Sequence, residues 1–223
     1  MGKMIELTAS DGHKLAAYRA DPSAKPRGAV VVIQEIFGVN SHIKAVTDGY
    51  AADGYVAIAP AMYDRVQRNY DTGYSQDEIQ AGLKIMQGLD WSNTMKDVAA
   101  ALEAVKSAGK VGIVGYCWGG TVAWVAAARV PGLAASAPYY GGGMPNFMDE
   151  KPKVPVLCNF GELDQSPTPD QAKALLAKHP QVQGHFYPGA GHGFNCDHRG
   201  SYNAGASKLA RERTLEFFRK NLG

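Results

Sequence analysis

A cysteine stands among glycines in the stretch VGYCWGG, residues 114–120. The G-x-C-x-G spacing around Cys117 is that of a nucleophile elbow, a sharp turn from a strand into a helix, with Cys where Ser usually stands. The helix that follows would direct its free N–H groups and the positive end of its dipole at the thiol, which favours the thiolate. The pattern predicts a nucleophile at Cys117, and a structural thiol buried in a tight turn is the alternative.

A nucleophile of this type needs a base and a further group that orients the base. In the chain order that accompanies the elbow, an acid and then a histidine follow the nucleophile. Asp164 follows a predicted strand in NFGELDQ, and His192 lies in the glycine-rich stretch GAGHGF after the next strand. We expect both side chains to converge on Cys117. Glu162 is the rival acid, but it lies closer to the preceding strand.

The same region offers His192, Cys196 and His198 as potential metal ligands. No C-x-x-C or H-x-x-x-H spacing accompanies them, so we expect no metal site. The chain also has no dinucleotide fingerprint and no P-loop, and we therefore expect no organic cofactor.

Apolar, β-branched stretches alternate along the chain with amphipathic stretches. Predicted strands cover residues 4–9, 13–20, 28–35, 54–60, 110–116, 133–141, 154–161 and 184–188. Predicted helices cover residues 41–53, 75–89, 91–109, 119–130, 168–180 and 204–222. This alternation predicts an α/β fold, a mostly parallel twisted sheet with helices on both faces, whose reactive groups lie at the carboxyl ends of the strands. Segment 62–74 is rich in Tyr, Arg, Asp and Asn and predicts a surface loop.

The 223-residue chain has an ordinary globular composition, with 45% hydrophobic residues, 20% charged residues and a formal net charge of +2. This length suits a single domain over residues 1–223. No cluster of Lys and Arg favours nucleic-acid binding, and no apolar run has the length of a membrane span. The N-terminus lacks a signal-peptide core, and three widely spaced cysteines do not suit a disulfide framework. We expect a cytoplasmic monomer.

Taken together, these features resemble the dienelactone hydrolase family of α/β-hydrolases over nearly the whole chain. The resemblance rests on QEIFG at residues 34–38, GYCWGG at 115–120, the acid after GEL, GAGHGF at 189–194 and ERTLEFF at 212–218. It implies the α/β-hydrolase fold and a catalytic triad of Cys117, Asp164 and His192.

The resemblance also implies roles for three residues beside the triad. Glu35 would lie next to the nucleophile and help to control its protonation. The backbone N–H groups of Ile36 and Trp118 would hold the oxyanion that develops at the substrate carbonyl. Glu35 ends an apolar stretch, where a carboxylate needs a partner, and a solvated strand end is the alternative.

The sequence departs from the family where arginines of the family bind a substrate carboxylate. Cys196 stands four residues after the triad histidine, where the family has one such arginine. Residues 72–89, where the family has another, contain no Arg. Arg199 is our candidate for this role, with Arg65 and Arg68 as further candidates. An exposed surface position is the alternative for each.

Aromatic residues near the predicted triad are candidates for the walls of a substrate pocket, namely Phe37, Tyr139 and Phe194, together with Trp118. Each could equally belong to the core. The loop tyrosines could form a lid or a further wall, namely Tyr63, Tyr70 and Tyr74.

The leading hypothesis is a Cys-dependent hydrolase of small esters or lactones of the dienelactone type, acting through a thioester acyl-enzyme. A broad carboxylesterase or thioesterase without lactone preference is the second hypothesis. A non-catalytic sensor of redox state or ligands on the same fold is the third, since a thiol at a helix N-terminus is also prone to oxidation. Such a sensor would not need the acid–base pair of Asp164 and His192.

Overall fold

In a computed structural model that describes residues 1–223, the chain forms one eight-stranded sheet. The strands are β1 (Lys3–Thr8), β2 (Lys14–Ala20), β3 (Ala29–Ile33), β4 (Val56–Pro60), β5 (Val111–Tyr116), β6 (Leu133–Tyr139), β7 (Leu157–Gly161) and β8 (Gln183–Tyr187). The α-helices are α1 (Ser41–Ala52), α2 (Gln76–Gln87), α3 (Trp91–Val105), α4 (Trp118–Arg129), α5 (Pro169–Lys178) and α6 (Ala204–Leu222). Two short 3-10 helices are η1 (Lys106–Ala108) and η2 (Met144–Phe147).

The strands lie in the order β1-β2-β4-β3-β5-β6-β7-β8. The pairs β1–β2 and β2–β4 are antiparallel, and the remaining pairs are parallel. The central strands β3 and β5 are buried along their whole length, as expected for parallel strands covered on both faces. Because β5, β7 and β8 run in the same direction, the loops that follow them meet at one edge of the sheet.

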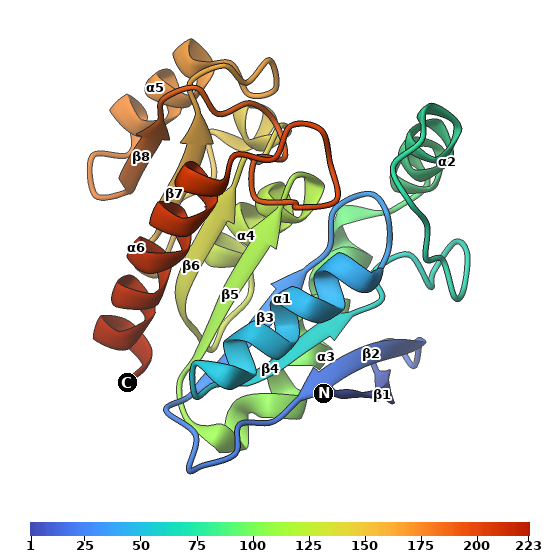
Figure 1. The fold of residues 1–223 in the computed structure, drawn as a ribbon. Helices are drawn as coiled ribbons and strands as arrows, with labels where there is room; N and C mark the ends of the chain where they lie inside the picture. Colours follow the sequence, from blue (N-terminus) through green and yellow to red (C-terminus); the bar gives the residue numbers. More distant parts are fainter.

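Helices cover both faces of the sheet, α1 and α6 on one face and α3 and α4 on the other (Figure 1). Strand β3 serves both layers, because successive side chains of a strand point to opposite faces. Val31 and Ile33 join the cluster with α3 and α4, whereas Val30 and Val32 join the cluster with α1 and α6. Helix α2 projects at one side of the molecule (Figure 1), and its Ile85 joins the cluster with α3 and α4.

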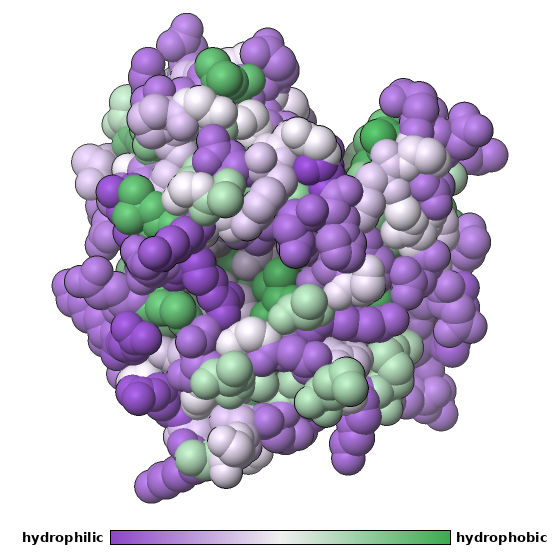
Figure 2. All heavy atoms as spheres, viewed as in Figure 1, coloured by the Kyte–Doolittle hydropathy of each residue, from purple (hydrophilic) through white to green (hydrophobic).

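The outer surface is mostly hydrophilic in the view of Figure 2, and hydrophobic residues there form small separate groups. None of the helices is both long and apolar enough to cross a membrane.

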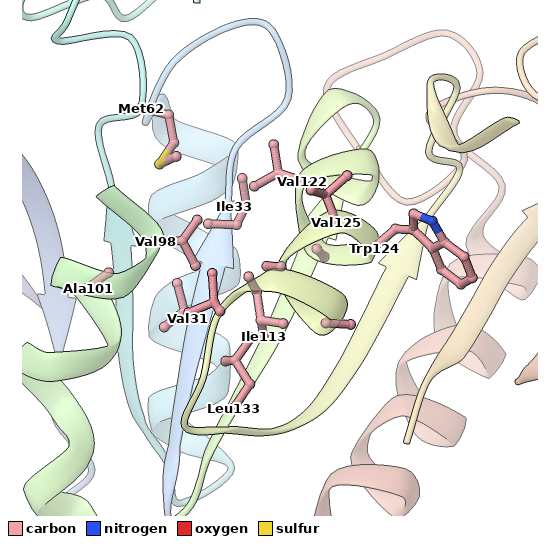
Figure 3. Close-up of a cluster of buried hydrophobic side chains, with 14 of the residues drawn as sticks. Val31, Ile33, Met62, Val98, Ala101, Ile113, Val122, Trp124, Val125 and Leu133 are labelled. Carbon is pink, nitrogen blue, oxygen red and sulfur yellow. The ribbon is translucent and has the colours of Figure 1, made fainter. Parts of the chain in front are cut away.

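The core beneath α4 fixes the position of the elbow. Figure 3 shows Val31, Ile33 and Ile113 of the sheet beside Val98 of α3 and Val122 of α4. All five side chains are fully buried. Burial of one such side chain contributes about 1.5–3 kcal/mol, so this cluster holds α4 firmly against β3 and β5.

The predicted α/β architecture is confirmed. Helix α2 begins with a capping box formed by Ser75 and Glu78. The surface loop predicted over 62–74 is wrong for its first residues. Met62 and Tyr63 are buried, and so is Asp64, which accepts the N–H of Ala16 at 2.8 Å. The polar composition of this segment wrongly suggested exposure, because the Asp64 carboxylate accepts a hydrogen bond from the backbone of β2 and does not face solvent.

Candidate active site

The elbow joins β5 to α4, with Cys117 at the turn. Cys117 has φ 55° and ψ −119°, a conformation that costs energy for any residue with a side chain. Its N–H donates to the carbonyl of Tyr139 at 3.1 Å, which anchors the turn to β6. A Cβ on Gly115 would lie 1.9 Å from the carbonyl oxygen of Gly119. Only glycine therefore allows the helix to begin so close to the strand.

Three side chains from distant parts of the sequence meet at this turn. Nε2 of His192 lies 3.0 Å from Sγ of Cys117, and Nδ1 lies 3.1 and 3.2 Å from the two carboxylate oxygens of Asp164. Asp164 is buried, and it also accepts the N–H of Ser166 at 2.8 Å. The rival acid Glu162 is exposed. The structure thus brings together the nucleophile, base and acid of the sequence analysis.

The charge environment of His192 is set by its two partners. Burial alone would lower the pKa of this imidazole. The charge of the Cys117 thiolate and the hydrogen bonds to Asp164 and Cys117 outweigh that effect and raise the pKa well above its ordinary value of 6.5. The arrangement therefore favours the imidazolium form of His192 and places this proton donor 3.0 Å from the sulfur of Cys117.

Two residues of the cavity that contains the thiol have backbone N–H groups that donate to no protein acceptor. Trp118 is the first residue of α4, where the N–H has no intrahelical partner, and Ile36 lies in the loop after β3. Both residues line the same cavity as Cys117. These are the amides that the sequence analysis assigned to an oxyanion hole.

Glu35 lies two residues after the end of β3, is only 1% exposed, and has a paired carboxylate. Nη1 of Arg199 donates to Oε1 at 3.0 Å, and the guanidinium also lies 5.6 Å from the centre of the Phe37 ring. Gly193 makes room for this pair, since a Cβ there would lie 2.4 Å from Nη1 of Arg199. Glu35 is therefore an internal ion-pair member rather than a solvated strand end.

Replacing Arg199 by glutamine is expected to lower the free energy of unfolding by about 3 kcal/mol, because the buried Glu35 carboxylate would lose its counter-charge. The double variant Glu35→Gln/Arg199→Gln should recover most of this loss, since no unpaired charge remains. Urea unfolding followed by circular dichroism measures both values. Equal destabilisation of the single and double variants would contradict this account of the ion pair.

The thiol opens into a cavity of about 560 Å³ between the sheet edge, α2, the start of α3 and η2. Phe37, Trp118, His192 and Arg199 line it. Two of the predicted substrate-binding residues, Phe37 and Arg199, are thus in position to contact a molecule bound beside Cys117.

The other two predicted pocket residues, Tyr139 and Phe194, lie outside this cavity. The hydroxyl of Tyr139 is 2.7 Å from Oγ1 of Thr214 on α6, and Phe194 packs against Tyr139 and Tyr187. Both are fully buried in the layer with α1 and α6. Both side chains face the core between the sheet and these two helices. They do not line the cavity, and their assignment to the pocket is corrected.

The loop residues considered as clamp or lid also lie elsewhere. Arg65 forms a bidentate pair with Asp97 at 2.7 Å, and Arg68 binds the carbonyl of Lys14. Among the loop tyrosines, Tyr63 packs on Tyr70 and on Trp118, and Tyr74 packs on Phe37. None of the three tyrosines lines the cavity. Arg199 is the one arginine among the cavity residues.

Sequence reasoning missed Tyr140, the second tyrosine of the YYG at the end of β6. Its ring meets the His192 ring edge-on, with centroids 5.3 Å apart, and its buried hydroxyl has no hydrogen-bond partner. Burial raises the pKa of Tyr140 well above its ordinary value, so the hydroxyl stays neutral. Its place directly after a strand end, like that of Cys117, was the available signal.

The potential metal ligands named in the sequence analysis do not form one cluster in the structure. His192 contacts Cys117 and Asp164. Cys196 instead lies with His42 and Asp197, and the donor atoms of these three residues are all within 4.8 Å of one another. Nδ1 of His42 is 3.0 Å from a carboxylate oxygen of Asp197, an ordinary hydrogen bond. Burial raises the pKa of Cys196 to about 11, so this thiol is protonated at neutral pH.

Comparison with known proteins identifies the family. The sequence profile of the dienelactone hydrolase family matches residues 15–222. The chain belongs to this family. A carboxymethylenebutenolidase of Pseudomonas putida is 33% identical, over 96% of this chain and 94% of that protein. A candidate carboxymethylenebutenolidase of Synechocystis is 35% identical, over 94% of this chain and 93% of that protein.

Solved structures agree with this membership. The crystal structure of a candidate dienelactone hydrolase from Klebsiella pneumoniae has a TM-score of 0.80 and 29% identity, and the match covers 97% of this chain and 98% of that one. The protein is therefore a dienelactone hydrolase-like ester or lactone hydrolase with the α/β-hydrolase fold. This family member carries the protonated thiol of Cys196 where the resemblance placed an arginine, and Arg199, three residues later, reaches the cavity instead.

Proposed function

We propose that the chain hydrolyses esters or lactones through a thioester formed on Cys117, with Asp164 and His192 as the rest of a catalytic triad. The observation that supports this most directly is the 3.0 Å contact between Sγ of Cys117 and Nε2 of His192. A thiol used only as a redox or ligand sensor would not need a histidine that a buried carboxylate orients.

In the first half-reaction, the Cys117 thiolate attacks the carbonyl carbon of the substrate. A carbon–sulfur bond forms, and the electron pair of the carbonyl moves onto its oxygen. When the tetrahedral intermediate collapses, the carbon–oxygen bond to the leaving group breaks, and Nε2 of His192 gives its proton to the departing oxygen. In a lactone this oxygen stays attached to the acyl group through the opened ring.

In the second half-reaction, the now neutral His192 takes a proton from water as the water oxygen attacks the thioester. The carbon–sulfur bond breaks, the thiolate returns, and a carboxylic acid leaves. In both steps the N–H groups of Ile36 and Trp118 hold the oxyanion. Removing one such donor from an oxyanion hole typically costs about 3 kcal/mol of transition-state stabilisation.

Arg199 is the proposed partner for an anionic group of the substrate, since it is the one cationic side chain of fixed charge among the cavity residues. Its partner is Glu35, and we assign to this carboxylate a role in controlling the protonation of the Cys117 thiol during the proposed cycle. We propose that the 223 residues act as one catalytic domain, because residues from the loop after β3 through to the loop after β8 line the same cavity.

The acyl-enzyme can be trapped directly. The protein is mixed with p-nitrophenyl acetate, quenched in acid within the first turnovers, digested, and examined by mass spectrometry. We expect one acetyl group on the peptide that contains Cys117, removable by neutral hydroxylamine, as a thioester requires. Turnover without any labelled Cys117 peptide, or an acetyl group on a serine or histidine peptide instead, would contradict the proposal.

A further inference from the structure

The cavity at Cys117 is larger and more apolar than a small polar lactone requires. Its volume of about 560 Å³ lies in the range of sites that enclose drug-sized ligands. That is roughly the space of 19 water molecules in the liquid, whereas a single lactone ring with one carboxylate leaves much of it unfilled.

One wall of this cavity is built from side chains that the hydrolytic chemistry does not use. Helix α2 contributes Leu83 and Met86, the turn into α3 contributes Leu89 and Trp91, and η2 contributes Phe147. All five side chains are only partly buried. In Figure 2, hydrophobic residues lie on the side of α2 that faces the notch between this helix and the rest of the molecule. Exposed apolar surface gathered in a concave site marks ligand binding.

This apolar wall is built before any ligand arrives. Trp91 and Phe147 pack edge to face, with ring centroids 4.6 Å apart and an interplanar angle of 64°. The hydroxyl of Tyr63 donates to the carbonyl of Gly82 at 3.3 Å, which ties α2 to the buried start of the loop after β4. A preformed apolar site binds a ligand more tightly, because no free energy is spent on ordering its side chains.

The charge of the lining argues in the same direction. Among the cavity residues outside the triad, Arg199 is the one charged side chain, and it already pairs with Glu35. The wall formed by α2, Trp91 and Phe147 offers no ionic partner to a second anionic group. A substrate with several carboxylates or phosphates would leave them unpaired there, which is costly in an apolar environment.

We propose, on the basis of the function proposed above, that the substrate is an ester with a medium-sized apolar group, a hydrocarbon chain or an aromatic ring, bound against Leu83, Met86, Trp91 and Phe147. The reacting carbonyl lies at Cys117, and at most one anionic group reaches Arg199. Dienelactone itself is then a poor match for this chain, because it has no group to fill the wall.

Two series of aliphatic esters test this, with proton release followed by a pH indicator. Methyl butyrate and methyl octanoate differ in the acyl group, whereas butyl acetate and octyl acetate differ in the alcohol. Each fully buried methylene contributes about fourfold in binding, so four partly buried ones should raise kcat/KM at least about tenfold. We expect this rise in one of the two series, and that series shows which side of the ester faces the wall.

Variants in the wall locate the effect. Met86→Glu places a carboxylate in the apolar wall and should reduce the preference for the longer ester to less than about threefold. Met86→Leu, which keeps the site apolar, should retain the preference. Leu209→Glu is the matched control, because Leu209 is an exposed apolar residue of α6 outside the cavity, and it should behave as the wild type.

The outcomes separate this inference from the function on which it rests. Cys117-dependent hydrolysis with the same kcat/KM for short and long esters in both series would overturn the inference and leave the hydrolase proposal standing. A preference that Met86→Glu and Leu209→Glu leave equally intact would overturn the assigned wall. Failure to hydrolyse any of the four esters, together with no labelled Cys117 in the trapping experiment, would overturn both proposals.

Discussion

Replacing Cys117 by alanine is expected to lower kcat/KM for ester hydrolysis by about 10⁴-fold or more. The variant keeps the cavity, the free amides of Ile36 and Trp118, and the pair of His192 and Asp164, but it has no atom that can form the acyl-enzyme. What remains is the catalysis that binding and an oxyanion hole provide over water, which in triad enzymes is about 10³- to 10⁴-fold. Steady-state hydrolysis of p-nitrophenyl acetate measures the loss.

A second cysteine provides the matched control. Cys158 is a fully buried thiol of β7, outside the cavity, and Cys158→Ala removes a thiol without touching the triad. We expect this variant to keep its activity at the cost of about 1 kcal/mol of stability. Full esterase activity in Cys117→Ala would remove the nucleophile from the proposed mechanism. Equal losses in both cysteine variants would point to damaged folding instead.

The position of the proposed triad follows from local signals in the sequence. The glycines around Cys117 indicate a sharp turn from a strand into a helix. The strands before Asp164 and His192 end at the same edge of the sheet as the strand before Cys117. Parallel strands impose this meeting point whatever the details of packing. Glu162 and Asp164 follow the same strand, and the sequence favoured Asp164 because Glu162 lies closer to that strand. In the structure Asp164 contacts Nδ1 of His192, whereas Glu162 is exposed.

The pairing of Glu35 with Arg199 could not be predicted in the same way. The two residues are 164 positions apart, and the contact depends on how the loop after β8 folds back over the elbow. Gly193 is compatible with this pairing, because a side chain at position 193 would collide with the Arg199 guanidinium. The sequence offered several arginines for the cavity, and only the folded loop distinguishes Arg199 from Arg65.

Tyr139 and Phe194 show why pocket walls are harder to predict than triads. Both residues lie next to catalytic loops, but neighbouring side chains at a strand end point to opposite faces, so proximity in sequence does not give the direction. Tyr139 faces Thr214 of α6, whereas Cys117 faces the cavity. The apolar wall on α2 was missed for a related reason, since an amphipathic helix shows an apolar face but not what that face covers.

Asp164→Asn is expected to lower kcat by about 10³- to 10⁴-fold, the second large effect on the proposed mechanism. The carboxylate holds Nδ1 of His192 as a hydrogen-bond donor at 3.1 Å, which leaves Nε2 free to exchange a proton with Cys117. An amide can instead donate to Nδ1 and stabilise the tautomer whose Nε2 already carries its proton. That tautomer cannot take a proton from water in deacylation.

The pH dependence of the same variant separates this role from simple loss of structure. The pKa of His192 is raised above 6.5, so the imidazolium of the ion pair persists at neutral pH and is lost only as the pH rises through that higher value. The alkaline limb of kcat/KM should therefore lie well above pH 6.5 in the wild type. Without the Asp164 charge the pKa of His192 falls, and the limb should move toward lower pH.

Glu162→Gln is the control for this experiment, because Glu162 is an exposed acid two residues from Asp164 and has no contact with His192. We expect its rate and its pH profile to match the wild type. A large loss of rate in Asp164→Asn with an unmoved alkaline limb would mean that Asp164 acts through packing rather than through the charge of His192. An unchanged rate would exclude Asp164 from the triad, because no other carboxylate contacts Nδ1 of His192.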